Sequence, residues 1–392
     1  MNKTYKTIVF FSFYFPPDLS AGSFRNSTLL DMLETQSKEK LAKVVITTQP
    51  NRYKDFRLKS QAYERKGSIE IYRIKIPDHQ SGVLDQIKAF SIYFYRGLRI
   101  ALKYNPDLVY ASTSRLFSGF LGAFYSRLKM ASLYLDVRDI FFDTITDIYK
   151  KDMLKYIISP IVSIVEIISM ESATHINLIS AGFKSYFDRK YPGKSYTYFT
   201  NGVDDLFLDN NFSSETSIGD KQSIVYAGNI GEGQGLHILI PGLAKKLSHY
   251  TFLIIGDGGA KQKLVDEIQD LSNVYLLPPM ARVDILEHYK MSTYTLIHLN
   301  DNEAFKKVLP SKVFELAAIN KPILAGVAGY ASQFLSEQVE QCLLFKPGDY
   351  ESAAKLIQDH QYQLVNRFRF RDIYSRSNIN FRMVESILFY VS

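Results

Sequence analysis

A run of residues suited to binding a charged ligand lies at Pro310-Ser-Lys-Val-Phe-Glu315-Leu-Ala-Ala-Ile-Asn-Lys-Pro322-Ile-Leu-Ala-Gly326. The pattern predicts a loop, a short helix that begins near Ser311, and a buried strand from Pro322 to Ala325. Glu315 stands one turn into this helix among apolar residues. Its carboxylate is therefore expected to be shielded from water and to need partners.

Ser311 and Glu315 are four residues apart, so they share one face of the expected helix at roughly 5–6 Å. The free N–H groups at Ser311 and Lys312 would bind an anion, helped by the helix dipole. A carboxylate one turn away could accept hydrogen bonds from two hydroxyl groups. Together these groups fit the ribose-diphosphate part of a nucleotide. The alternative is an ordinary α/β turn in which Glu315 forms a structural ion pair.

The elements that would position these residues alternate between strand and helix. Strands are predicted at residues 7–12, 44–47, 69–74, 108–112, 132–137, 175–179 and 196–200, and again at 223–227, 251–255, 274–277, 293–299, 322–325 and 342–345. This alternation predicts α/β architecture with two doubly wound, largely parallel sheets. We place the first domain at 1–208, a polar linker at 209–222, the second domain at 223–366 and C-terminal helices at 367–392.

The segment Lys312-Val-Phe-Glu-Leu-Ala-Ala, followed by Lys321-Pro-Ile-Leu-Ala, resembles the donor-site motif of retaining GT-B glycosyltransferases of the "group 1" class, family four. The Pro310-Ser-Lys lead-in resembles a subgroup from bacterial O-antigen and capsule clusters that includes N-acetyl-L-fucosamine transferases. The resemblance extends over nearly the whole chain. It implies two Rossmann-like domains facing across a cleft, with the acceptor on the first and the nucleotide sugar on the second. It also implies a C-terminal helix that crosses back to the first domain, and it assigns Glu315 to the ribose.

A glycine-rich segment, Ala227-Gly-Asn-Ile-Gly-Glu-Gly-Gln-Gly235, follows a predicted strand and precedes a helix. Its glycines allow the backbone to approach a phosphate and to point N–H groups at it. The family commonly has Arg or Lys where Asn229 and Gln234 stand, and this chain lacks both cations. The subgroup is similar to this chain in having Gly-Asn-Ile-Gly. Pro241-Gly242 is expected to interrupt the helix that follows.

By the same resemblance, the next strand ends flank the base and the phosphates. The donor-binding residues predicted in this way are Gly228, Asn229, Gly231, Gly256, Pro279, Met280, Arg282, Ser311, Lys312 and Glu315. Many relatives carry a second Glu eight residues before Glu315, and here Lys307 takes that position. Lys306, Lys307 and Lys312 put cations beside the proposed diphosphate, and the nearest candidates for sugar contacts are Asp301, Asn302 and Glu303.

Two strand ends of the first domain are further candidates, because open α/β sheets place ligands there. In the loop from Phe15 to Arg25, Gly22 allows close backbone approach and Arg25 supplies a fork of donors. A plain strand–turn–helix connection is the alternative. Asp136-Val-Arg-Asp139 could orient a sugar hydroxyl or could pair internally. The predicted catalytic residues are Gly22, Arg25, Asp139, Arg282 and Lys307.

Composition limits the classes of function. The chain has 392 residues, of which 46% are hydrophobic and 22% charged, as in globular proteins. The single Cys342 excludes an intramolecular disulfide and a cysteine metal cluster and fits a reducing compartment. The histidines lack His-x-x-x-His spacing, so no metal is expected. A net charge of +7 favours a polyanionic or membrane-surface partner, and no zinc-finger, RNP-type or basic-zipper pattern points to nucleic acid.

Two segments are candidates for contact with a membrane. Residues 84–104 predict a helix with basic and aromatic residues interleaved, which could lie on an anionic membrane or could pack on the sheet with a solvated basic face. Residues 153–170 are strongly apolar, but Pro160 and Glu166 interrupt them, so we predict a packed helix rather than a membrane span. Pro16-Pro17 follows the apolar run at 8–15, which we interpret as the first strand rather than as a signal peptide.

These observations predict a cytoplasmic enzyme on the inner face of the cytoplasmic membrane. The resemblance implies that it would move a sugar from a nucleotide-diphosphate sugar, most simply a UDP-sugar, to a lipid-linked glycan in O-antigen or capsule synthesis. The resemblance implies a retaining reaction without metal or other cofactor. The alternatives are a GT-B UDP-sugar epimerase and a non-catalytic scaffold that binds nucleotide sugars. The absence of cations at Asn229 and Gln234 motivates the scaffold.

Overall fold

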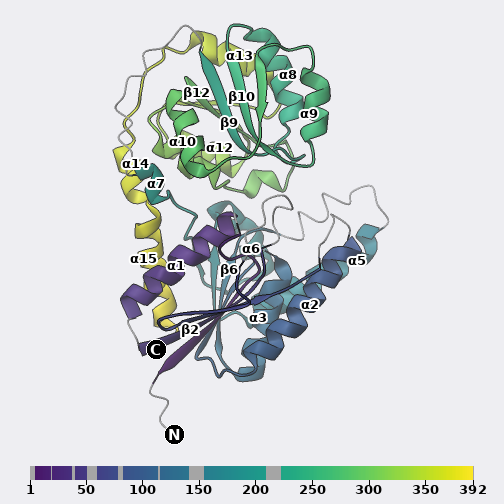
Figure 1. Ribbon diagram of the computed structural model, residues 1–392, viewed down its shortest axis with the longest axis vertical. Coiled ribbons are helices and arrows are strands. Elements are labelled where there is room, and N and C mark those ends of the chain that lie inside the picture. The colour runs from purple at the N-terminus through teal and green to yellow at the C-terminus, as the bar shows by residue number, and fades with distance from the viewer. Residues whose placement is uncertain are drawn as a thin grey trace. The chain divides into compact units, whose positions relative to one another are not determined.

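The computed structural model describes residues 5–18, 20–37, 40–50, 60–77, 83–113, 115–140, 154–208 and 222–391. The chain divides into two compact units (Figure 1): unit 1 comprises Met1–Asn201 and Ile379–Ser392, and unit 2 comprises Gly202–Asn378. Each unit is built on its own sheet. The predicted fold class, α/β with two largely parallel sheets, is confirmed. Of the predicted linker at 209–222, only Gln222 lies among the described residues.

Unit 1 has an eight-stranded sheet in the order β3-β4-β2-β1-β5-β6-β7-β8. Its strands are β1 (Lys6–Ser12), β2 (Leu41–Thr48), β3 (Tyr63–Lys66), β4 (Ile69–Ile74), β5 (Leu108–Ser112), β6 (Ser132–Val137), β7 (His175–Leu178) and β8 (Tyr196–Thr197). Its helices are α1 (Ala21–Ser37), α2 (Val83–Ala101), α3 (Leu116–Lys129), α5 (Leu154–Ser172), the 3₁₀ turn η2 (Ala181–Phe183), α6 (Lys184–Lys190) and most of α15 (Arg376–Phe389). All neighbouring strands are parallel except β3 and β4.

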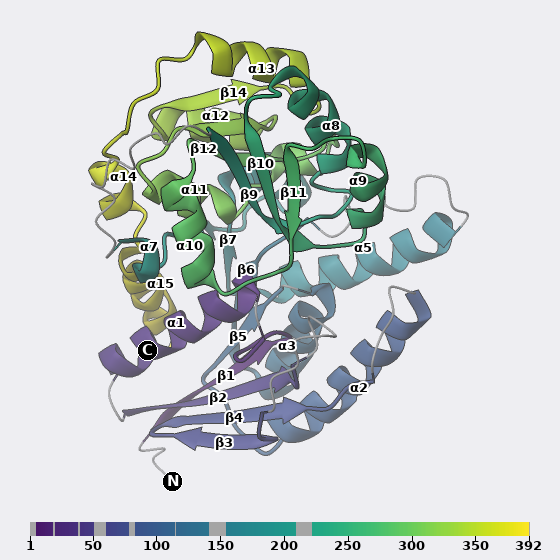
Figure 2. The ribbon, with the colours of Figure 1, turned by 45° about the horizontal axis from the view of Figure 1, so that its top comes forward.

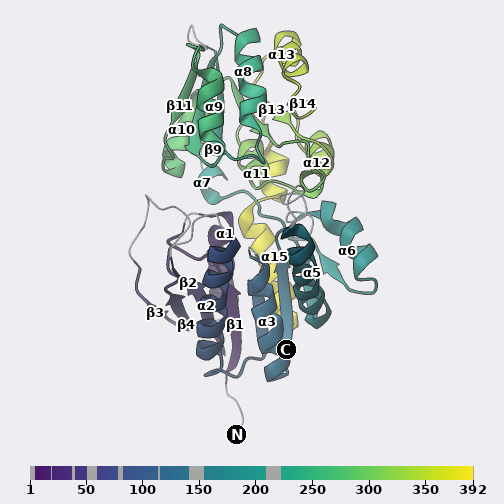
Figure 3. The ribbon, with the colours of Figure 1, turned by 90° about the vertical axis from the view of Figure 1, so that its right-hand side faces the viewer.

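The sheet of unit 1 is covered by helices on both faces, because successive side chains of a strand point to opposite sides. Phe10 of β1 contacts Tyr110, with ring centroids 4.8 Å apart, and belongs to the core that α1 and α15 cover. Its neighbour Phe11 contacts Tyr125 of α3 at 5.7 Å. On that side α3 packs against both α2 and α5 (Figure 3).

Unit 2 has a six-stranded, fully parallel sheet in the order β11-β10-β9-β12-β13-β14 (Figure 2). Its strands are β9 (Ser223–Asn229), β10 (Thr251–Asp257), β11 (Val274–Leu277), β12 (Tyr294–His298), β13 (Ile323–Gly326) and β14 (Cys342–Phe345). Its helices are α7 (Asp205–Leu208), α8 (Leu236–Lys246), α9 (Lys261–Ile268), α10 (Arg282–Met291), the turn η3 (Phe305–Lys307), α11 (Lys312–Ala318), α12 (Tyr330–Gln338), α13 (Tyr350–Asp359) and α14 (Phe368–Ile373).

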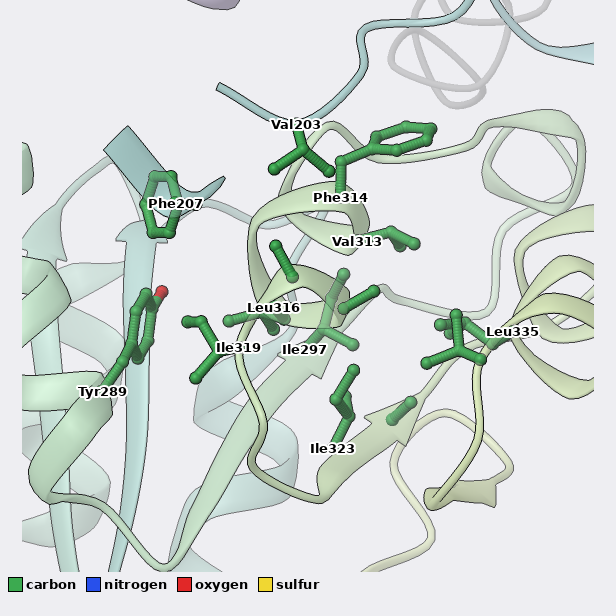
Figure 4. Packing of buried hydrophobic residues seen from close by; sticks show 14 of the residues in the cluster. Val203, Phe207, Tyr289, Ile297, Val313, Phe314, Leu316, Ile319, Ile323 and Leu335 are labelled. Atoms are coloured by element: carbon green, nitrogen blue, oxygen red, sulfur yellow. The ribbon is translucent and has the colours of Figure 1, made fainter. Parts of the chain in front are cut away.

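The short helix α11 owes its position to one of the two hydrophobic cores of unit 2 (Figure 4). Its residues Val313, Phe314 and Leu316 are almost fully buried there, together with side chains of β12, β13, α10 and α7. Burying these side chains stabilises the helix by about 1.5–3 kcal/mol each. A helix of seven residues would not be stable alone, so packing fixes the direction in which Glu315 projects.

Several expectations from the sequence need correction. Helix α8 was expected to be interrupted at Pro241 and Gly242, but it continues through both residues. A Cβ atom at Gly242 would lie 2.5 Å from the Tyr350 ring, so the glycine allows α8 and α13 to pack closely. The strand β3 was not predicted, because this short antiparallel edge is charged and mostly exposed.

The two candidate membrane segments form helices, with changed details. Helix α2 ends at Ala101 rather than at 104. Its buried side includes Ala89, Tyr93 and Gly97, and Ile87 is exposed. Helix α5 covers most of the second segment, and Pro160 lies inside it. Among the described residues, none of the helices has both the length and the apolar character needed to cross a membrane.

Candidate functional site

The predicted donor residues gather at the carboxyl edge of the sheet of unit 2. The chain runs from β9 outward to β10 and β11 on one side and to β12, β13 and β14 on the other. Open α/β sheets bind ligands at such a reversal of strand order, outside the carboxyl ends of the strands. The glycine-rich loop follows β9, and the loop that leads to α11 follows β12. Both loops therefore lie beside the point where the strand order reverses.

The glycine-rich loop is held in place by hydrogen bonds of its own residues. The Asn229 amide donates to Gln234 Oε1 at 2.7 Å, and the Gly231 N–H donates to the same oxygen at 3.3 Å. The two positions where the family commonly has cations are thus occupied by an amide pair that fixes the loop. Gly256 at the end of β10 has φ +145°, and a Cβ atom there would lie 1.9 Å from the Gly228 carbonyl oxygen. Only glycine permits this close approach of the two strand ends.

Glu315 lies between two cations. Its Oε1 is 2.9 Å from Arg282 Nη2, and its Oε2 is 2.6 Å from Lys312 Nζ. The Glu315 side chain is 16% exposed, against 28% for Arg282 and 26% for Lys312. Burial acts to raise the pKa of Glu315, but Lys312 and Arg282 outweigh it and hold the pKa below its usual value. Burial likewise acts to lower the pKa of Lys312, and Glu315 together with Tyr289 raises it.

The ion pair of Glu315 belongs to a larger cluster. Arg282, the first residue of α10, also pairs with Asp204, and Asp204 pairs in turn with Arg376. Three cations therefore face two carboxylates, so the cluster has a net positive charge. A cluster of this sign at the carboxyl edge of the sheet favours an anionic ligand.

The remaining predicted residues of unit 2 lie in the segments that precede α10 and α11. Ser311 directly precedes α11 and is half-buried, and Lys307 ends the turn η3. In the loop between β11 and α10, Pro279 is exposed and Met280 packs on the core beneath α11. Among the candidates for sugar contacts, Glu303 pairs with Lys306 at 2.6 Å.

In unit 1 the structure places Arg25 inside the protein. Helix α1 begins at Ala21, so Gly22 and Arg25 lie in its first turns rather than in a loop. Arg25 is fully buried, and its Nε is 3.0 Å from Asp136 Oδ2. Its Nη2 donates to the Phe199 carbonyl at 2.7 Å, so its fork of donors serves the fold. This placement differs from the expected contact with a ligand.

The Asp136-Val-Arg-Asp139 segment contributes mainly buried groups. Burial acts to raise the pKa of Asp136, but Arg25 and Arg138 hold it below its usual value. Arg138 is also buried and donates to Asn201 Oδ1 at 3.2 Å. Asp139 is exposed. Internal pairing, one of the two alternatives for this segment, therefore accounts for Asp136.

Two members of the charged cluster were not predicted from the sequence. Asp204 and Arg376 are 172 residues apart and meet where Val203 and Ser375 form an isolated parallel bridge. No local pattern signals such a contact.

Among the residues that the structure describes, no three His, Cys, Asp or Glu side chains are arranged to hold a metal ion.

Comparison with known proteins now identifies the class. Residues 209–360 match the family described as "Glycosyl transferases group 1". No curated protein sequence matches the chain. The structure is similar to sucrose-phosphate synthase from Thermosynechococcus elongatus, with TM-score 0.74 and 14% identity over 99% of this chain and 100% of that one.

Two further solved structures are similar over both units. HepE from Anabaena, in complex with UDP-glucose, has TM-score 0.66 and 17% identity over 97% of this chain and 99% of that one. The lipopolysaccharide outer core galactosyltransferase WaaB has TM-score 0.62 and 12% identity over 97% of this chain and 99% of that one. The family match in unit 2 and the fold of the whole chain agree with each other. The chain is therefore a glycosyltransferase with the GT-B fold.

Proposed function

We propose that the protein transfers a sugar from a UDP-sugar to a lipid-linked oligosaccharide in O-antigen or capsule synthesis. The resemblance of the segment around Glu315 makes UDP-N-acetyl-L-fucosamine the first donor to test. The similar structure of Anabaena HepE contains UDP-glucose, which supports a UDP-linked donor. The similarity to a lipopolysaccharide outer core galactosyltransferase supports a cell-surface glycan as product.

The observation that carries this proposal is the position of Glu315 between Arg282 and Lys312 at the carboxyl edge of the sheet. An ionised carboxylate has about four lone-pair sites, and two ion pairs leave room for hydroxyl donors. Glu315 can therefore accept bonds from the ribose hydroxyls while its cations face the diphosphate. The adjoining glycine-rich loop brings backbone N–H groups to the same edge.

The proposed reaction is a retaining displacement. The bond between the anomeric carbon and the diphosphate oxygen breaks, and the acceptor hydroxyl forms its bond on the same face of the sugar. Because the acceptor attacks on the face from which the diphosphate leaves, no enzymic nucleophile is needed. The hydroxyl proton passes to the leaving phosphate oxygen, so no enzymic base is needed either. Arg282 and Lys312 stabilise the charge that develops on the diphosphate, which is the electrostatic task a metal would otherwise perform.

The proposed acceptor side involves an anionic membrane surface. Helix α2 exposes Arg96 and Arg99. Helix α5 exposes Ile161, Ile164 and Ile167, which are 52%, 56% and 42% accessible and recur every three residues. Basic residues attract anionic lipid, and exposed apolar side chains can enter the boundary of the lipid chains. These exposed side chains support the proposal that the enzyme works in the cytoplasm, on the inner face of the cytoplasmic membrane.

Release of UDP with and without acceptor tests the proposal. The purified protein is incubated with each of a panel of UDP-, GDP- and dTDP-sugars, alone and with a lipid-linked glycan acceptor. Acceptor-dependent release of UDP, together with a product of higher mass, is the expected result. An epimerase would change the sugar without acceptor, and a scaffold would bind the nucleotide without releasing product. The match to the glycosyltransferase family favours neither alternative. An epimerase would also need an acid and a base, and the carboxylates of the cluster, Glu315 and Asp204, are both paired with cations.

A further inference from the structure

His298 is enclosed beneath the glycine-rich loop. It is the last residue of β12 and only 2% exposed. Its Nδ1 is 2.5 Å from the Gln234 carbonyl oxygen, and the Gly348 N–H donates to its Nε2 at 2.9 Å. A carbonyl can only accept and a backbone N–H can only donate, so these partners require a neutral ring with its proton on Nδ1.

The surroundings keep this ring in one orientation. A Cβ atom at Gly326 would lie 2.3 Å from His298 Cδ2, so the neighbouring strand β13 approaches the ring as closely as glycine allows. The Phe345 ring lies nearly parallel to the imidazole, with centroids 6.2 Å apart. His298 therefore connects the loop after β9 to the loop after β14 through a ring that packing holds still.

Gln234 is the residue through which His298 would act. The Gln234 side-chain oxygen accepts from Asn229 and from the Gly231 N–H, and its main-chain oxygen accepts from His298. Both polar ends of Gln234 are thus fixed, one within the loop and one to the sheet. The loop carries no cation at Asn229 or Gln234, so its backbone must be well placed to bind phosphate.

Asn300 completes the attachment of the loop to β12. Its N–H donates to the Gly233 carbonyl at 2.8 Å, and its side-chain amide donates to the Glu232 carbonyl at 3.2 Å. The carbonyl and N–H of one trans peptide point in opposite directions. With the Glu232 carbonyl directed at Asn300, the Gly233 N–H points away from it, where a phosphate oxygen can accept its hydrogen bond.

We propose that His298 is a positioning residue for the sugar donor. By holding the Gln234 carbonyl, its Nδ1–H keeps the glycine-rich loop in the conformation that presents backbone N–H groups to the diphosphate. This inference rests on the proposed function, because it assigns the loop to a nucleotide diphosphate. The bond to Gln234, and not the bulk of the ring, carries the effect.

Two substitutions separate these contributions. His298→Asn places an amide N–H near the position of Nδ1 and keeps a donor for Gln234, whereas His298→Gln places an acceptor near Nε2 and loses that donor. We expect calorimetric titration with UDP to give His298→Asn an affinity within about threefold of wild type and His298→Gln a loss of about tenfold or more. His249→Gln, at an exposed position, is the matched control.

Hydrogen exchange of the unliganded protein tests the positioning without any nucleotide. Peptides covering 228–235 should exchange faster in His298→Gln than in wild type, and His298→Asn should stay close to wild type. This result would stand even if wild type failed to bind UDP, in which case the proposed function would fail instead. Equal loss of UDP affinity in both variants would overturn the inference, since it would place the effect in the missing ring. The inference would also be overturned if both variants bound UDP and exchanged hydrogen as wild type does, and differed from it only in a lower melting temperature.

Discussion

At the scale of single residues, the two roles open to Glu315 are compatible with each other. The carboxylate forms ion pairs with Arg282 and Lys312, as a structural residue would, yet it remains partly accessible at the edge where a nucleotide is expected. An ion pair and a ribose contact do not exclude each other, because each oxygen can accept more than one hydrogen bond. Stability measurements alone therefore do not identify the role of Glu315.

Replacing Glu315 with Gln tests the ribose contact. The amide keeps the size and one acceptor but loses the charge, and a hydrogen bond to a charged group contributes roughly 1.5–3 kcal/mol. We expect UDP to bind about 10- to 150-fold more weakly in calorimetric titration. UDP and the UDP-sugar should lose affinity equally, since the contact is to the part they share.

The exposed Glu267→Gln variant on α9 controls for the loss of one charge from the same unit. Thermal unfolding of all three proteins is measured in parallel. If Glu315→Gln melted at a lower temperature but bound UDP as wild type does, Glu315 would be a structural residue and the ribose contact would lie elsewhere.

The buried ring of His298 also predicts how stability depends on pH. Burial lowers the pKa of His298 to about 4, although the Gln234 carbonyl opposes this, and the nearby His237 lowers it further. Between about pH 4 and the ordinary value of 6.5, the unfolded chain binds a proton here that the folded chain does not. The free energy of unfolding should therefore fall as the pH decreases through this window, by about 2–3 kcal/mol from this group.

Urea unfolding of wild type and His298→Asn at a series of pH values measures this contribution. The difference between the two proteins should shrink from pH 7 to pH 4, because the variant lacks the titrating ring. Carboxylates and His175, whose pKa burial also lowers to about 4, titrate in both proteins and cancel in the difference. Parallel curves would show that His298 does not resist protonation.

Residue types could be predicted from the sequence more readily than their partners could. Glu315 is a candidate from the sequence because a carboxylate among apolar helix residues is unusual. The burial of Arg25 could not be inferred, because its partner Asp136 is 111 residues away and lies on a different strand. Asp204 and Arg376 were missed for the same reason. Pairing across long sequence separations depends on the tertiary fold, which a local pattern does not contain.

At the scale of elements, strands were the most predictable parts. The bounds of β4, β5, β6, β11 and β14 are those predicted, because each strand is a short segment, rich in apolar residues or alternating between apolar and polar ones as in β4, that lies between turn residues. The packed faces of helices were less predictable. On α2 the side chains packed on the sheet include the small residues Ala89 and Gly97, which carry little hydrophobic signal.

Helix α2 offers a direct test of membrane contact. Reversing Arg96 and Arg99 of α2, together with Lys103 just after its end, to Glu should release the protein from vesicles that contain anionic phosphatidylglycerol. Each basic residue near such a surface contributes about 1 kcal/mol, so the affinity should fall by at least about 150-fold in a sedimentation assay.

The control for this experiment reverses Lys245, Lys246 and Lys263, which are exposed on helices of unit 2 and give the same change in net charge. A second variant, Ile164→Asn on α5, tests the apolar contribution. Vesicle binding by the α2 variant that equals wild type would return α2 to the role of a sheet-covering helix with a solvated basic face.

At the scale of the whole molecule, the proposed reaction depends on protein groups to neutralise the diphosphate. Addition of EDTA should leave acceptor-dependent UDP release within about twofold of the untreated rate, because in the proposed reaction Arg282, Lys312 and backbone N–H groups take the place of a metal ion. Restoration of a lost activity by Mg²⁺ or Mn²⁺ would contradict this expectation. The transfer reaction is quenched first. The UDP formed is then quantified in a coupled assay, and the metal ion that this assay needs is added only at that stage.

The return of Ile379–Ser392 to unit 1 also has a consequence for synthesis on the ribosome. Met383, Val384 and Ile387 of α15 are fully buried in the core formed with α1 and β1. Unit 2 is, in topology, an insertion within unit 1, and the nascent chain contains all of unit 2 before these core residues emerge. Domains generally fold as units during synthesis. Unit 2 is therefore expected to reach its native state first. Unit 1 completes its hydrophobic core only after α15 has been synthesised, and until then the apolar side chains that pack against α15 stay exposed.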